Sequence, residues 1–157
     1  MNKGYKIIPL EAGHVKKLAK WHHREWKELY WDWDIDFYIC ELRSQIGDEQ
    51  VPYTWVCMSD NKIVGSVSII NDDLKSHAHL NPWIGNLYVK KSYRNQGIGT
   101  SLLKFAMAKA VNWDISPIYL FSTHHVEFFT RHDWQVVETF KHNDKDITIL
   151  KFSNAAK

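Results

Sequence analysis

A strand, a glycine-containing turn, a helix and a second strand follow one another over residues 84–121, and this unit constrains the fold most. Residues 84–89 form a short apolar run that is typical of a strand. Apolar side chains then recur at helical spacing from about 97 to 112, and 117–122 reads as the next strand. A crossover through a helix returns the chain in its original direction, so the two strands should be parallel neighbours.

The rest of the pattern predicts a mostly antiparallel sheet. A hairpin is expected at the turn Ser59-Asp60-Asn61, and a helix should begin at its cap Asp34 and end at Gly47. The other elements are predicted at 5–9, 53–58, 63–70, 134–140 and 146–152 (strands) and at 12–30 and 124–132 (helices). We therefore predict an α/β (α+β) fold, a single mixed sheet of roughly six to seven strands flanked by about four helices. No repeat or linker divides the chain, so residues 1–157 are expected to form one domain.

Composition excludes several classes of partner. The net charge is +2 and the lysines are scattered, which argues against nucleic acid and against an anionic membrane surface. The N-terminal residues lack the apolar run of a signal peptide, and no stretch approaches the length that spans a bilayer. Cys40 and Cys57 lie far apart in apolar segments, as buried thiols in a reducing compartment do. These features predict a cytoplasmic protein.

The turn Arg94-x-x-Gly97-x-Gly99 is predicted to bind phosphate. The N–H groups of a helix's first turn lack backbone partners and the helix dipole adds partial positive charge, so this end suits an anion. Gly97 and Gly99 have no Cβ and let the backbone approach phosphate oxygens, and Arg94 adds a charged donor fork at the same rim. A Rossmann site is disfavoured because the third glycine is missing, and a P-loop because Gly-Lys-Ser/Thr is absent.

Several segments resemble one protein family, in the order in which that family has them. The acetyl-CoA motif of the GNAT-type N-acetyltransferase superfamily is similar to Val89-x-x-x-Tyr93-Arg94-Asn95-Gln96-Gly97-Ile98-Gly99-x-x-Leu102-Leu103. The family's central hairpin resembles Lys62-Ile63-Val64-Gly65-Ser66, and its fifth strand resembles residues 118–123. A later element of the family resembles Phe128-Phe129-x-Arg131-x-x-Trp134. A branch of small bacterial members, whose substrates are unassigned, is similar to this chain at Pro82-Trp83-Ile84-Gly85.

The resemblance implies a GNAT fold and transfer of an acetyl group from acetyl-CoA to a primary amine, by direct attack in a ternary complex. Leu87 and Val89 would pair with the pantetheine arm through their backbones, and Phe129 would belong to the coenzyme site. An N–H near Tyr88 or Val89 would polarise the thioester carbonyl as an oxyanion donor. The residues implied to hold the pyrophosphate through backbone N–H groups are Arg94, Asn95, Gln96, Gly97, Ile98, Gly99 and Thr100.

The proton donor for the departing thiolate differs from the family pattern. In many members it is a tyrosine where this chain has Phe129, which cannot donate a proton. Ser122 and His124 are the candidate replacements, with Thr123 and His125 beside them.

The attacking amine must also lose a proton, because a free alkylamine is mostly protonated at neutral pH. Asp73 is the candidate base, with Asp72 and Glu25 as alternatives. Acidic residues and four tryptophans crowd residues 21–36, a composition that suits a cationic amine through ion pairing and cation–π contacts. The acceptor is expected to be an amine of a small molecule or a peptide, and the predicted acceptor-binding residues are Glu25, Trp26, Trp31, Trp33 and Trp83.

Other functions remain open at this point. Phe129 is compatible with a coenzyme A-binding sensor or interaction module that has lost catalysis. Nine histidines raise the question of a metal site, but no pair has the i, i+4 helical spacing of zinc enzymes, so no metal is expected. The resemblance is compatible with a homodimer, although no residue establishes one.

Overall fold

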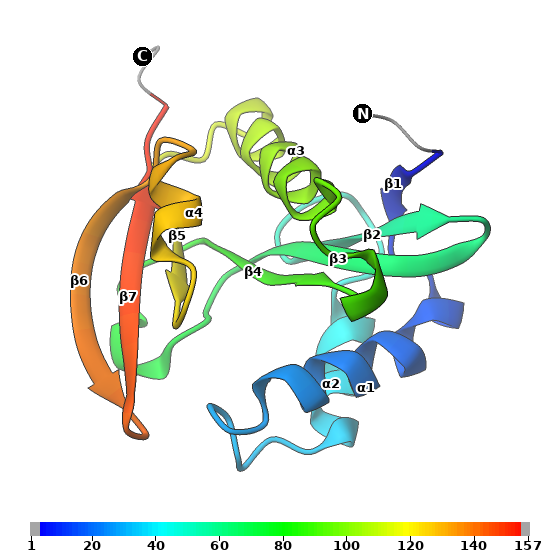
Figure 1. Cartoon of the computed structure of the whole chain (residues 1–157), viewed down its shortest axis with the longest axis horizontal. Coiled ribbons are helices and arrows are strands. Elements are labelled where there is room, and N and C mark those ends of the chain that lie inside the picture. The colour runs from blue at the N-terminus through cyan, green and yellow to red at the C-terminus, as the bar shows by residue number, and fades with distance from the viewer. Residues whose placement is uncertain (1–3, 155–157) are drawn as a thin grey trace.

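The computed structural model describes residues 4–154. These residues contain a mixed sheet of seven strands (Figure 1). The strands lie in the order β1-β2-β3-β4-β5-β7-β6, and neighbours are antiparallel except for the parallel pair β4–β5. Their bounds are Lys6–Pro9 (β1), Tyr53–Ser59 (β2), Lys62–Ile70 (β3), Trp83–Val89 (β4), Ile118–Ser122 (β5), Gln135–His142 (β6) and Lys145–Phe152 (β7). The predicted parallel pair within an antiparallel sheet is confirmed.

Four α-helices flank this sheet in the described residues. They are α1 (Val15–Trp26), α2 (Ile35–Ser44), α3 (Ile98–Asn112) and α4 (Val126–Thr130), with 3-10 turns at Ala12–His14, Lys75–His77 and Lys91–Tyr93. The helices α1 and α2 pack on one face of β2, β3 and β4, and α3 packs on the other (Figure 1). Because both faces are covered, β2 and β3 are buried along almost their whole length.

The first helix is shorter than the predicted span of 12–30. The chain starts with the 3-10 turn Ala12–His14, and α1 ends at Trp26. After α1 the chain turns, so that the ring of Tyr30 stacks on Trp33 with 3.9 Å between the ring centroids. Aromatic packing between these two residues therefore ends the helix before its apolar periodicity does.

The second helix begins where the sequence predicts and ends early. The carboxylate of its cap Asp34 accepts a first-turn backbone N–H at 2.8 Å. The last helical residue is Ser44 instead of a residue next to Gly47, because Gln45 leaves the helix and accepts a hydrogen bond from Thr54 at 2.6 Å in the core.

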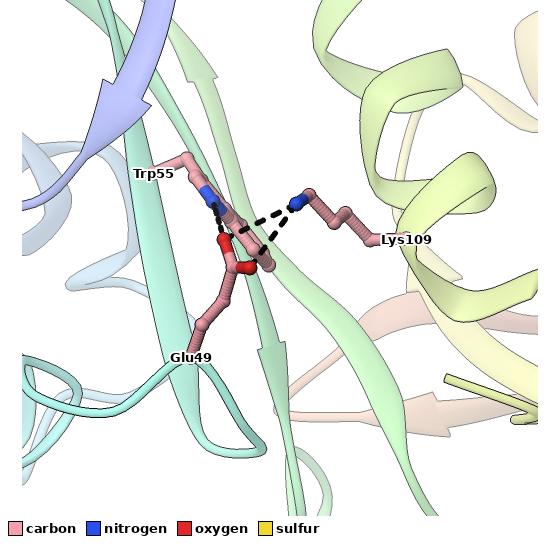
Figure 2. A network of polar contacts seen from close by, with 3 residues as sticks. All are labelled: Glu49, Trp55 and Lys109. Atoms are coloured by element: carbon pink, nitrogen blue, oxygen red, sulfur yellow. Dashed lines mark hydrogen bonds and ion pairs between the residues drawn. The ribbon is translucent and has the colours of Figure 1, made fainter. Parts of the chain in front are cut away.

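One carboxylate fastens the loop between α2 and β2 to α3 (Figure 2). Glu49 accepts from the indole N–H of Trp55 at 3.3 Å and pairs with Lys109 at 3.2 Å. The ammonium of Lys109 also lies 5.9 Å from the centroid of the Trp55 ring. A partly exposed pair of this kind contributes about 1 kcal/mol at most, so it fixes the loop more than it stabilises the fold.

The centre of β4 carries a bulge. Ser66 of β3 lies opposite Tyr88 and Ser68 lies opposite Gly85, which leaves two β4 residues facing one residue of β3. The first of these two, Asn86, has a φ of +53°, in the left-handed region that asparagine adopts more readily than most residues. A bulge bends its strand and increases the local twist.

The strands β4 and β5 diverge. They share one register pair, Trp83 with Tyr119, at the start of β4. Beyond that pair the bulged half of β4 turns away from β5, and a slot opens between the two strands.

The close contact between β3 and β4 generates a stability prediction. A Cβ on Gly65 would lie 2.8 Å from the carbonyl oxygen of Tyr88 and 3.0 Å from Cδ1 of Leu102. Because the backbone of Tyr88 cannot move away without straining the sheet, Gly65→Ala should lower the free energy of unfolding by about 1–3 kcal/mol, as measured by urea titration. Gly13→Ala is the matched control, because a Cβ there meets nothing within 4 Å. Equal stability of the two variants would contradict this account of the contact.

Candidate functional site

A cavity of about 550 Å³ occupies the slot between β4 and β5. It reaches both faces of the sheet, because its walls include the start of α3 on one side and rings from α1 and α2 on the other. The residues that line it include Glu25, Trp26, Tyr30, Trp33, Tyr38, Asp73, Gly85, Asn86, Leu87, Tyr88, Val89, Arg94, Gly97, Gly99, Phe121, Ser122, His124 and Phe129.

The turn before α3 forms one end of the cavity. Asn95 (φ +63°) and Gly97 (φ +86°) both adopt left-handed backbone, and Gly97 is the residue from which α3 starts. A Cβ on Gly97 would meet nothing within 4 Å, so the space in front of the turn is open. The N–H groups of the first helical turn, from Ile98 onward, have no acceptor within the helix. This end therefore combines turned backbone, orphan donors and the positive end of a helix dipole.

Two side chains of the turn point elsewhere. We expected Arg94 to add its guanidinium to the phosphate rim, but the structure directs it back across the cavity. Its Nε donates to the carbonyl of Val89 at 2.7 Å, its Nη2 lies 3.6 Å from Glu25, and its Cζ lies 5.4 Å from the ring centroid of Tyr88. The side chain of Gln96 is exposed outside the cavity and accepts from the Tyr5 hydroxyl at 2.5 Å. The groups of this turn that are suited to an anion are thus those of the backbone and not these side chains.

The open edge of β4 forms the middle of the cavity. The N–H of Lys90 donates to Val64 of β3 at 2.8 Å. Backbone groups of successive strand residues point to opposite edges, so those of Leu87 and Val89 face the slot. The bond from Arg94 to the Val89 carbonyl agrees with this direction. An extended ligand arm lying in the slot would therefore meet the backbone of Leu87 and Val89.

A buried network holds the bulge. Ser66 donates to the backbone carbonyl of Asn86 at 2.6 Å, and the Asn86 amide donates to Ser68 at 2.9 Å. His22 lies behind Ser66, with Nε2 2.9 Å from the hydroxyl oxygen. Because the Ser66 proton is already used, His22 must donate from Nε2, which leaves Nδ1 as the bare nitrogen that has no partner in the described residues. Burial lowers the pKa of His22 to about 3, so the ring is neutral.

Aromatic rings form the other end of the cavity. The stacked pair Tyr30 and Trp33 contacts Tyr38 on one side and Phe121 of β5 on the other, with centroid distances of 5.9 Å from Trp33 to Tyr38 and 6.4 Å from Tyr30 to Phe121. Trp26 adds a further ring from the end of α1. This end is therefore apolar apart from a few ring hydroxyls and the group described next.

One carboxylate lies among these rings. Asp73 sits against β4, since a Cβ on Gly85 would lie 3.3 Å from its Oδ2. The hydroxyl of Tyr30 donates to the backbone carbonyl of Asp73 at 3.0 Å and so fixes the loop. No group in the described residues donates to the carboxylate itself, and burial raises the pKa of Asp73 to about 7. The side chain is therefore poised to exchange a proton near neutral pH.

The hydroxyl of Tyr38 also lacks a partner. The residue is 5% exposed, lines the cavity and makes no hydrogen bond through its hydroxyl within residues 4–154. Burial, and then the charge of Asp73, raise the pKa of Tyr38, so the hydroxyl keeps its proton. A buried hydroxyl without a partner costs free energy unless a ligand forms a hydrogen bond with it.

The end of β5 and the residues after it form a third wall. Ser122 is buried, and its oxygen accepts from the backbone N–H of His125 at 2.9 Å, so it caps the turn before α4. His124 lines the cavity from an exposed position, and Phe129 is buried against Trp134 and α3.

Most of the predicted site residues come together, and some do not. Asp73, Ser122 and His124 line the cavity, as do Glu25, Trp26 and Trp33. Trp31 is 76% exposed outside it, because the chain turns at residues 27–33, and Trp83 is fully buried where β4 meets β5. Asp72, the alternative base, is exposed and lies outside the cavity, whereas Glu25 is paired with Arg94.

Sequence reasoning missed Tyr30, Tyr38 and Asn86. Helix α2 buries Tyr38 together with Leu42, and Ile35 and Ile39 pack partly buried against the same cluster. The signal that was available is the spacing of Tyr38, Leu42 and the buried Gln45.

The described residues show no group of three or more side chains able to hold a metal ion. Within the same range, no helix combines the length and apolar character that a membrane crossing needs.

The comparisons with known proteins agree with this geometry. Residues 17–134 match the model of the acetyltransferase (GNAT) family. No curated protein sequence matches the chain.

Solved structures share the fold at low identity. An N-acetyltransferase from Staphylococcus aureus Mu50 is similar with a TM-score of 0.76 and 11% identity, over 95% of this chain and 98% of that one. A ribosomal-protein-alanine N-acetyltransferase from Brucella melitensis gives 0.75 and 14%, over 95% and 99%. The PaiA N-acetyltransferase from Thermoplasma acidophilum, solved with coenzyme A, gives 0.68 and 17%, over 96% and 99%.

The environment of Asp73 predicts a stability change that depends on pH. The raised pKa of about 7 means that stability is lost as pH rises from the ordinary carboxyl value of about 4 through 7, because only the folded state holds the charge in a poorly solvated place. Asp73→Asn should therefore raise the free energy of unfolding by about 1–3 kcal/mol more at pH 8 than at pH 4. Urea unfolding at both pH values measures this, with the exposed neighbour variant Asp72→Asn as control. A stability change that is equal at the two pH values would contradict the buried charge.

Proposed function

Because this chain belongs to the acetyltransferase (GNAT) family, we propose that its cavity transfers an acetyl group from acetyl-CoA to a primary amine, by direct attack in a ternary complex. Membership of the family makes the chain an acyl-CoA-dependent acetyltransferase. The observation that best supports the fuller proposal is that one cavity joins a phosphate-suited helix start to a carboxylate without a partner. We propose an acceptor amine on a small molecule or a peptide.

The donor half of the proposal concerns coenzyme A. Its pyrophosphate would be held by the backbone of residues 94–100, from Arg94 to Thr100, at the start of α3. The pantetheine arm would run along the open edge of β4 and pair with Leu87 and Val89, with Phe129 forming the wall beside it. The Thermoplasma acidophilum neighbour was solved with coenzyme A, which supports the same ligand here.

The acceptor half concerns proton transfer. Asp73 accepts a proton from the ammonium, directly or through a water, and the neutral amine then attacks the thioester carbonyl. The oxyanion that forms takes a hydrogen bond from the N–H of Leu87 or Val89, because these groups face the slot whereas that of Tyr88 faces β3. Collapse breaks the carbon–sulfur bond and forms the amide.

The departing thiolate takes the second proton of the nitrogen. We assign the transfer of this proton from the nitrogen to the thiolate to His124, because the oxygen of Ser122 is engaged in the turn before α4. An imidazole is the side chain best suited to exchange protons near neutrality. Phe129, in the place of the usual tyrosine, has no part in this step.

The first test of this proposal concerns coenzyme binding. In Gly97→Trp the new ring would fill the open space in front of the α3 turn, and acetyl-CoA affinity measured by calorimetry should fall at least about tenfold. Gly47→Trp is a matched control, since Gly47 also has positive φ (+134°) and open surroundings but lies outside the cavity. Retained affinity in Gly97→Trp would remove the turn from the coenzyme site.

The second test concerns the base. The value of kcat/KM for a primary amine, followed by thiol release, should rise with pH through about 7 as Asp73 loses its proton. Asp73→Asn should lower it by about 100-fold and flatten this rise, while acetyl-CoA affinity stays unchanged. An unaltered pH profile would exclude Asp73 as the base. Coenzyme binding without turnover of any amine would favour the non-catalytic module.

A further inference from the structure

The cavity carries very little positive charge. Among the described residues that line it, Arg94 is the one Lys or Arg, and its guanidinium is already engaged by the Val89 carbonyl and by Glu25. His124 and His125 lie on the exposed turn after β5. At the ring-lined end the charge is therefore negative, from Asp73 when its carboxylate is ionised.

The same end offers two polar atoms to a ligand. The hydroxyl of Tyr38 has no partner in the described part of the chain, and the contact of Asp73 with Tyr30 there uses its backbone carbonyl instead of its carboxylate. Both residues line the one cavity. The rings of Trp26, Tyr30 and Trp33 line the same cavity. A primary ammonium fits this set, since it donates to both oxygens and is attracted to aromatic faces.

An anionic group near the nitrogen does not fit. The carboxylate of a free α-amino acid lies one carbon away from the amine, and here it would approach Asp73 with no cation to pair with. Like charges brought together where solvent is scarce oppose binding strongly. The cavity must also hold the coenzyme arm within its 550 Å³, so the room left for the acceptor is small.

We propose that the acceptor is a small apolar amine whose only charge is its ammonium group, such as an arylalkylamine, and that free amino acids are rejected by their carboxylate. This inference rests on the proposed acetyl transfer. It assigns Asp73 and Tyr38 to recognition of the ammonium and the rings to recognition of the body of the substrate.

A matched set of four acceptors tests this proposal on the unaltered protein. The set is 2-phenylethylamine, phenylalanine, phenylalaninamide and the tripeptide amide Phe-Gly-Gly-NH2, each assayed with acetyl-CoA by thiol release. Phenylalaninamide has nearly the shape of phenylalanine without its negative charge. We expect kcat/KM for 2-phenylethylamine and for phenylalaninamide to exceed that for phenylalanine by at least about 30-fold. Among the three acceptors without a carboxylate, the tripeptide should have the lowest kcat/KM.

The other outcomes separate the possible failures. Equal kcat/KM for phenylalanine and phenylalaninamide would overturn the charge argument. Rejection of both, with 2-phenylethylamine accepted, would also overturn it, because the size of the acceptor and not its charge would then determine the selectivity. Preference for the tripeptide would make the acceptor a peptide and overturn the small-molecule assignment. Turnover of other amines but of none of the four would sink this inference and leave acetyl transfer intact. No turnover of any amine would sink acetyl transfer itself.

The hydroxyl of Tyr38 provides a test by substitution. Tyr38→Phe should raise KM for the amine about 3- to 10-fold and leave KM for acetyl-CoA unchanged, because only the ammonium contact is lost. Thermal unfolding should not move to lower temperature, since the hydroxyl has no partner in the protein to lose. Tyr53→Phe, a buried tyrosine of β2 outside the cavity, is the control. An unchanged KM for the amine in Tyr38→Phe would remove Tyr38 from the acceptor site.

Discussion

The site depends on the bulge in β4. An unbroken strand would continue its pairing with β5 beyond Trp83 and close the slot that the cavity occupies. The bulge persists because Asn86 accepts from Ser66 and donates to Ser68, with His22 completing the network behind them. These polar groups would be costly in a core if left unpaired, so they specify the irregular strand over a regular one.

The slot lets the two faces of one sheet serve different chemical needs. Phosphate binding suits the start of α3, where the backbone supplies donors without long side chains. Recognition of an amine suits the opposite face, where burial among aromatic rings raises the pKa of the one carboxylate, Asp73. Arg94 bridges the two, since it contacts the end of β4 and Glu25 of α1.

The shape of the turn before α3 was predictable from sequence, and the ring-lined end of the cavity only partly. The turn depends on local backbone geometry at Gly97, which a short motif records directly. A cavity wall built from separate elements has no such short motif. A tryptophan in the sequence gives no sign of whether it lies in the core, on the surface or in a pocket. Trp83 is buried and Trp31 is exposed, although both were expected in the site. Tyr38 was overlooked because a tyrosine among the apolar residues of α2 gives no sign that its hydroxyl reaches a cavity.

The absent side chain at Gly85 ties two distant positions together. Any Cβ there would lie 2.9 Å from Cδ1 of Ile70 and 3.3 Å from Oδ2 of Asp73, so a larger residue would push the carboxylate from its place. In a relative that gains a side chain at this point of β4, the carboxylate would not keep this place. Through evolution Gly85 and Asp73 should therefore be kept or lost as a unit, and chains that share the pair should form a group marked by one position of β4 and one position of the loop before it.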